Sequence, residues 1–151
     1  MKQYLLLAVL IIVAFFVYSR FDQRPADMLS TEPTSLAPSD ATYTMVLFND
    51  GTGMRDVIAK GFTMRLVDNT ITGKICNSFN GAYTLSTDAI LTAPQVVSTK
   101  MMCEPDVMAV ENAFFAALGK GLDMRTDGQD ITFTAGTTVF VFKPLAGASA
   151  E

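Results

Sequence analysis

Hydrophobic positions divide the chain into parts with different patterns. Residues 5–17 are apolar without interruption, residues 22–40 hold few large apolar side chains, and residues 41–145 alternate between apolar and polar stretches. An uninterrupted apolar run leaves no polar face for water, whereas alternation with period two is typical of half-buried strands. The pattern predicts an N-terminal hydrophobic helix (1–21), a flexible linker rich in Pro, Ser and Thr (22–40), one folded domain (41–145) and a disordered tail (146–151).

Short strands separated by turn-forming residues make up most of the predicted domain. Asn49-Asp50-Gly51, Asp68-Asn69 and Asp127-Gly128 are typical turn sequences between strands. The predicted strands are residues 42–48, 62–67, 70–76, 82–85, 89–92, 95–99, 122–125, 130–133 and 138–142. Because successive strands follow through short turns, we expect antiparallel pairing.

One segment late in the domain has helical spacing. Pro105 suits the first turn of a helix, where no amide donor is needed, and Gly119 and Gly121 favour its end. Its apolar face consists of Val107, Val110, Phe114 and Leu118. The predicted fold class is α+β, a strongly bent antiparallel sheet or small open barrel with one main helix packed against it.

The N-terminal apolar run predicts export or membrane insertion. The uncharged residues 4–18 would span about 22 Å as a helix, less than the roughly 30 Å of a bilayer's hydrocarbon core. That length favours a signal peptide, but Val17-Tyr18-Ser19 is not an Ala-x-Ala cleavage signal. We therefore expect either a cleaved signal peptide or a signal-anchor helix that tethers the domain to the membrane, with the domain outside the cytoplasm. A cytoplasmic domain on a reversed anchor is the alternative, since flanking charges do not decide orientation.

Composition removes several classes of function. The chain has no histidine, two cysteines and a net charge of −4. A Ser-His-Asp triad, a Cys-His pair and a His-ligated metal site are therefore excluded. Nucleic-acid binding requires a cationic patch, and none is visible. We expect no cofactor, no metal site and no catalytic residues.

Three weaker motifs have both a functional and a structural interpretation. The loop of residues 49–53 could bind a cation or a phosphate, but a plain turn is the expected structure. Asp123, Asp127 and Asp130 could act as acid and base, but solvated charges around a hairpin are expected. Lys100 is expected to be a charge at a strand edge rather than an activating base.

Two segments hold both cysteines and carry a resemblance to a known family. Gly73-x-x-Cys76-Asn77-x-Phe79-x-Gly81-x-Tyr83, then Thr99-x-Met101-x-Cys103, then Glu111 and Phe114 on the helix, resemble the META domain, the family of HslJ-like heat-shock proteins. The resemblance implies a bacterial envelope protein, often behind a signal or lipoprotein segment, associated with heat shock and novobiocin resistance. It brings no catalytic residues with it.

Each residue of this motif also has a physical interpretation. Gly73 and Gly81 are expected to bracket a tight corner that needs positive φ. Asn77 is expected to bond the backbone of that turn, Phe79 to enter the core, and Tyr83 to begin the next strand with its hydroxyl at the rim. Thr99 and Met101 belong to the second half of the motif.

Cys76 and Cys103 have two possible states. A disulfide between them would close a loop of 28 residues in an oxidising compartment. Alternatively, two buried thiols would pack as small apolar groups. A redox-active pair is less expected, because the chain has no Cys-x-x-Cys sequence.

The functional expectation is a non-catalytic envelope protein that is exported or tethered to the membrane, with an envelope protein as a possible partner. The alternative is a protein-binding inhibitor or a chaperone-like module that uses a sheet edge or an apolar groove. The sequence does not determine the oligomeric state.

Overall fold

A computed structural model describes residues 41–145 of the protein. The predicted hydrophobic helix of residues 1–21, the linker of residues 22–40 and the tail of residues 146–151 lie outside the described residues. Within residues 41–145, no helix combines the length and the apolarity needed to cross a membrane.

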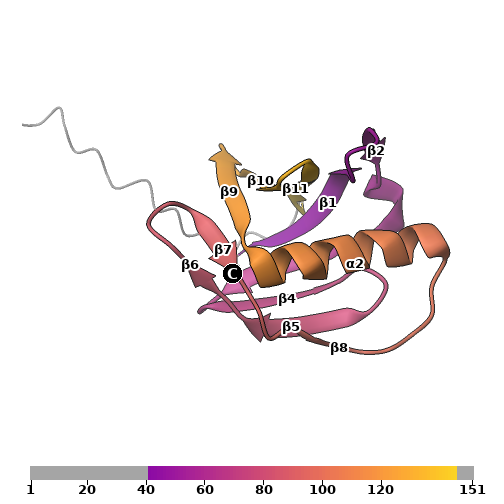
Figure 1. Ribbon diagram of the computed structural model, residues 1–151, viewed down its shortest axis with the longest axis horizontal. Helices are drawn as coiled ribbons and strands as arrows, with labels where there is room; N and C mark the ends of the chain where they lie inside the picture. Colours follow the sequence, from indigo (N-terminus) through magenta and orange to yellow (C-terminus); the bar gives the residue numbers. More distant parts are fainter. Residues whose placement is uncertain (1–40, 146–151) are drawn as a thin grey trace, which may run out of the picture. The chain divides into compact units, whose positions relative to one another are not determined.

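The described domain is an antiparallel sheet with one long helix, α2 (Pro105–Lys120), and one short 3-10 helix, η1 (Ile58–Lys60) (Figure 1). The strands are β1 (Thr42–Asn49), β2 (Met54–Asp56), β3 (Thr63–Val67), β4 (Thr70–Lys74), β5 (Ser78–Ala82), β6 (Thr84–Leu85), β7 (Ile90–Thr92), β8 (Val97–Ser98), β9 (Leu122–Asp127), β10 (Asp130–Ala135) and β11 (Thr138–Pro144). Their order in the sheet is β6-β7-β9-β10-β11-β1-β3-β4-β5-β8, and β2 pairs with β1.

The sheet curls strongly, as its connectivity requires. β6 is the first strand in the sheet order and β5 is next to last, yet Tyr83 alone separates them along the chain. The ring of Phe114 on α2 lies 5.9 Å from that of Phe79 on β5 and 5.1 Å from that of Phe140 on β11. One helix residue thus contacts strands from distant parts of the order, so the sheet bends around α2. The predicted bent sheet with one packed helix is confirmed.

The core fills the space between the curled sheet and the helix. Val110, Phe114 and Leu118 of the predicted apolar face are buried, and Val107 is partly buried against them. The helix begins at Pro105 and ends before Gly121, whose φ of 110° lies in the region that favours glycine. The predicted helix and its core-filling face are confirmed, but Gly119, which was expected to help end the helix, lies within it.

The expected role of Gly73 and Gly81 is wrong. Neither has positive φ, because both lie within paired strands, Gly73 in β4 and Gly81 in β5. A Cβ added at Gly73 would overlap the Thr63 carbonyl and approach Cζ of Phe79 to 2.7 Å, and one at Gly81 would lie 3.1 Å from the Gln95 carbonyl oxygen. Close packing, not backbone conformation, requires glycine at position 73, and at position 81 it leaves little room for a larger residue.

Several elements were missed or shortened in the sequence prediction because their periodic signal is weak. The corner predicted between Gly73 and Gly81 is confined to residues 75–77, and the rest of it is strand β5, which pairs with β4 from Thr70↔Ala82 to Lys74↔Ser78. The alternation of buried and exposed residues in β5 is weak, because Phe79 is its one large apolar side chain and its other residues are small or polar. β2 and η1 were also not predicted, since three-residue elements leave almost no periodic signal. The turn at Asp68 and Asn69 is confirmed, with φ values of 48° and 59° that match a two-residue hairpin.

Candidate functional site

The two halves of the sequence motif meet at a buried pair of polar side chains, Asn77 and Glu111, which we call the node. Asn77 lies in the turn between β4 and β5, and Glu111 lies on α2. Each is only 3% exposed. Buried polar groups are costly unless they are hydrogen-bonded, so their partners decide whether the node stabilises the fold.

The Glu111 carboxylate is fully engaged by neutral donors of the β4–β5 turn. Its Oε2 accepts the backbone N–H of Cys76 at 3.0 Å and that of Asn77 at 2.6 Å. Its Oε1 accepts the Asn77 side-chain amide at 2.8 Å. Hydrogen bonds to an ionised group are stronger than neutral ones, so Glu111 joins the helix firmly to the turn.

Asn77 extends the node to the second half of the motif. We call residues 97–103, which include β8 and run to Cys103, the strap. Asn77 Oδ1 accepts the Met101 backbone N–H at 2.6 Å and the Thr99 hydroxyl at 3.0 Å, and Asn77 Nδ2 donates to the Met101 carbonyl at 3.3 Å. The Asn77 side chain was expected to bond the backbone of its own turn, but it instead holds a segment 22 to 24 residues away.

A disulfide between Cys76 and Cys103 closes the far end of the strap. Their Cα atoms are 5.9 Å apart, within the usual range for a bridge. The bridge, the two Asn77 acceptor bonds and the pairing of β8 with β5 all hold the same short segment. Of the two states predicted for the cysteines, the structure contains the disulfide.

The remaining motif residues support the node through packing. Phe79 is buried, and its ring lies 5.3 Å from the ring of Phe115 on α2, so its expected place in the core is confirmed. Tyr83 connects β5 to β6, and its N–H donates to the Asn69 carbonyl at 2.8 Å. Burial raises the pKa of the Tyr83 phenol above its ordinary value, and the negative charge of Asp68 adds to the effect.

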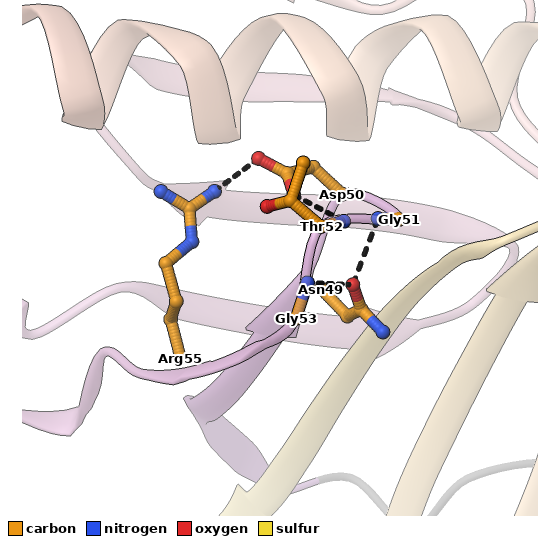
Figure 2. Close-up of polar contacts among 6 residues, drawn as sticks. All are labelled: Asn49, Asp50, Gly51, Thr52, Gly53 and Arg55. Atoms are coloured by element: carbon orange, nitrogen blue, oxygen red, sulfur yellow. Dashed lines mark hydrogen bonds and ion pairs between the residues drawn. The ribbon is translucent and has the colours of Figure 1, made fainter.

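The loop of residues 49–53 satisfies its own polar groups, as Figure 2 shows. Asn49 Oδ1 accepts the N–H groups of Gly51 at 2.7 Å and Gly53 at 3.2 Å. Asp50 accepts the Thr52 hydroxyl at 2.6 Å and pairs with Arg55, and the Thr52 hydrogen bonds lower the pKa of its carboxyl. With its carboxylate and amide oxygens bonded to the loop itself, the segment forms the plain turn that was expected.

Of the three candidate aspartates, Asp127 and Asp130 lie opposite each other across the β9–β10 hairpin, whereas Asp123 lies opposite Thr134. Asp123 lies beside Arg125 on β9, and Asp130 pairs with Lys143 at 2.6 Å. These are exposed ion pairs, which contribute little to stability. Lys100 is exposed on the strap. Within the part of the chain that the structure describes, no three His, Cys, Asp or Glu side chains are grouped as metal ligands.

An open hollow of about 320 Å³ lies beside the node, between β5 and the strap. It is lined by Ser78, Phe79, Asn80, Val97, Ser98 and Thr99. None of these side chains is ionisable, so the hollow offers shape and neutral hydrogen-bonding groups but no acid, base or nucleophile paired with a base.

Glu111 belongs to the sequence motif, but its role as acceptor for the donors of the β4–β5 turn was not predicted. Glu111 is adjacent to Val110 and three residues before Phe114, so it lies on the apolar face of α2. A carboxylate on such a face must find partners when it is buried, and this was the available signal. The sequence could not name the partners, which lie 34 and 35 residues earlier.

A family model described as the META domain matches residues 34–146. Among solved structures, the NMR structure of one protein is 19% identical to this chain. It has a TM-score of 0.59 and covers 71% of this chain and 91% of the other. An NMR structure of a protein from Burkholderia xenovorans is also 19% identical, with a TM-score of 0.58 over 74% of this chain and 85% of the other. At this identity the two structures support the fold alone. No curated protein matches the chain.

Proposed function

The chain belongs to the META domain family, and from that premise we propose that it is a non-catalytic domain of the cell envelope, exported or tethered through its N-terminal apolar segment. One observation carries the proposal: the Cys76–Cys103 disulfide closes the segment on which the family motif converges. Disulfides persist outside the cytosol and are rare within it. Export would thus place the two cysteines in an oxidising compartment, where the disulfide of the site can form.

A structural role for the node supports the non-catalytic part of the proposal. Glu111 is the buried carboxylate of the site, and both of its oxygens accept hydrogen bonds from the protein itself. A general acid or base must instead reach a substrate atom within hydrogen-bond distance. Glu111 therefore has the surroundings of a group that holds the helix, the turn and the strap together.

Cell fractionation combined with thiol labelling tests this proposal. We expect the full chain in the envelope fraction, with Cys76 and Cys103 resistant to a maleimide until a reductant is added. A matched variant that lacks residues 1–21 is expected in the cytosol with both thiols reactive. A full chain recovered from the cytosol with two free thiols would overturn the proposal.

A second candidate is a protein-binding module that uses the strap and the adjoining sheet edge. It is favoured by three exposed apolar side chains on the strap, Val97, Met101 and Met102. Apolar side chains gathered at a surface are typical of contact sites. Crosslinking from a photoreactive residue at position 102, compared with one at exposed position 54, tests it: enrichment of one envelope protein at 102 alone supports binding, and equal capture at both sites contradicts it.

The family also leads us to propose a role in stress tolerance. A strain without the protein should then be more sensitive to heat or to novobiocin, and the full chain should restore tolerance. The Cys76→Ala/Cys103→Ala variant should restore it less well if the closed strap is needed. Unchanged tolerance in the deletion strain would contradict this role.

A further inference from the structure

The strap presents two adjacent methionine side chains to solvent, unlike the methionines of the core. Met102 is 97% exposed and Met101 is 56% exposed. Met45, Met64 and Met124 are at most 1% exposed, and Met54 on β2 is 52% exposed. Exposing a large apolar side chain gains no hydrophobic stabilisation, so packing does not explain residue 102.

This exposure belongs to the folded state and does not require local unfolding. Both backbone polar groups of Met101 are bound to Asn77, the N–H at 2.6 Å and the carbonyl at 3.3 Å. Cys103, which directly follows Met102, is bridged to Cys76. The backbone is held on both sides while the two thioethers extend outward.

We propose that Met101 and Met102 form an oxidation site, and that Met102 is the first methionine of residues 41–145 to react with hydrogen peroxide or a related two-electron oxidant. A lone pair of the thioether sulfur attacks one peroxide oxygen and forms the S–O bond while the O–O bond breaks. The proton of the transferred oxygen passes to the second oxygen, which leaves as water. The sulfur loses two electrons and becomes a sulfoxide, and the peroxide is reduced. Methionine sulfoxide is polar and is repaired by sulfoxide reductases, so the change is reversible.

The fold should tolerate this modification. The Met102 side chain is almost wholly in solvent, and the strap contacts the node through the Met101 backbone and the Thr99 hydroxyl. A sulfoxide at Met102 therefore adds a polar atom where water already is. In the core the same atom would be buried without a partner, at a large cost. This reactivity is a property of the folded domain, whether or not the chain is exported.

A peroxide time course on the folded full chain tests the site. Samples are quenched with free methionine, reduced, alkylated, cut with trypsin and read by mass spectrometry, with fragmentation to separate Met101 from Met102. We expect Met102 to oxidise about twice as fast as Met54, in proportion to exposures of 97% and 52%, and at least about tenfold faster than the three core methionines. Oxidation of Met102 no faster than that of Met54 would overturn the site.

Two variants and a melting curve complete the test. In the peptides of residues 41–145, Met102→Leu should remove the fastest phase of oxygen uptake, whereas the matched Met54→Leu should leave it unchanged. Protein oxidised at Met102 alone should melt at the temperature of untreated protein. A lower melting temperature would show that the fold holds this side chain and would contradict tolerance; persistence of the fast phase in Met102→Leu would contradict the assignment.

Discussion

Glu111 and Asn77 bond to each other twice, once through a backbone group and once through a side chain. Glu111 Oε2 accepts the Asn77 N–H at 2.6 Å, and Glu111 Oε1 accepts its side-chain amide at 2.8 Å. The opposite side of the Asn77 amide then holds the strap through Thr99 and Met101. The helix, the β4–β5 turn and the strap thus share one buried hydrogen-bond network, and in such networks the loss of one member leaves others unsatisfied.

Glu111→Gln should destabilise the domain although its shape hardly changes. The glutamine NH2 group must face either the two backbone N–H groups or the Asn77 side-chain amide, so donors would face donors. We expect a loss of about 1–3 kcal/mol in the free energy of unfolding, measured by urea denaturation. Glu104→Gln, at an exposed position, is the control and should change stability little; equal stability of both variants would contradict the role of the node.

Gly73→Ala should destabilise the domain through overlap rather than through backbone strain. The new methyl group would meet the Thr63 carbonyl and the Phe79 ring, and backbone cannot move aside as a side-chain tip can. A cost of about 1–3 kcal/mol is expected from such overpacking, measured by thermal melting.

Gly119→Ala is the matched control for that substitution. Gly119 lies in α2, and apart from its chain neighbours and the adjoining helix backbone nothing lies within 4 Å of an added Cβ. Alanine should stabilise a helix at such a position by about 0.5–1 kcal/mol. Shifts in the same direction for both variants would show that close packing at Gly73 is not the deciding factor.

Removing the disulfide should lower stability and leave the fold in place. The bridge spans a sequence separation of 27 residues, and the chain-entropy relation assigns such a loop about 3.5 kcal/mol. The Cys76→Ala/Cys103→Ala variant should therefore melt roughly 15–25 °C lower than the oxidised protein while keeping its circular dichroism spectrum. Wild-type protein in dithiothreitol should shift in the same direction, and an unchanged melting temperature would contradict a structural bridge.

Lys60 should set the acid titration of Asp106 at the start of α2. Lys60 Nζ lies 3.0 Å from Asp106 Oδ2 and 3.0 Å from Glu104 Oε2. The hydrogen bond from Lys60 is the main cause that lowers the pKa of Asp106 below its ordinary 3.8, and the bond to Asp106 is the main cause that raises the pKa of Lys60 above 10.5. Lys60→Met should raise the pKa of Asp106, as read from its carboxyl carbon by NMR.

The two pKa shifts determine how the contribution of the Lys60–Asp106 pair to stability depends on pH. Because the folded pKa of Asp106 is depressed, its contribution is present above pH 3.8 and is lost as pH falls through the folded pKa. Because that of Lys60 is raised, its contribution is present below pH 10.5 and is lost as pH rises through the folded pKa. Both groups are exposed, so the stability difference should be small and weaken in salt. Lys143→Met, which disrupts a distant pair, should leave the Asp106 titration unchanged, and a shift there would contradict the assignment.

Short-range signals in the sequence were enough to predict most of the local structure of the domain. Turn residues such as Asp68-Asn69, the proline at the start of α2 and the glycine at its end act within a few positions of where they stand. Alternation predicted most strands for the same reason, and the apolar face of α2 predicted a core beneath it. The motif around Cys76 and Cys103 was enough to indicate the family and a possible bridge.

Tertiary structure alone decided how these pieces act together. Glu111 finds its donors 34 and 35 residues away, and Gly73 is needed because the Thr63 carbonyl and the Phe79 ring approach it. Such contacts depend on how far the sheet curls, which is set by the packing of all the strands around α2 and not by any short segment. For that reason the sequence named the residues of the site, and only the fold showed that they form one buried network.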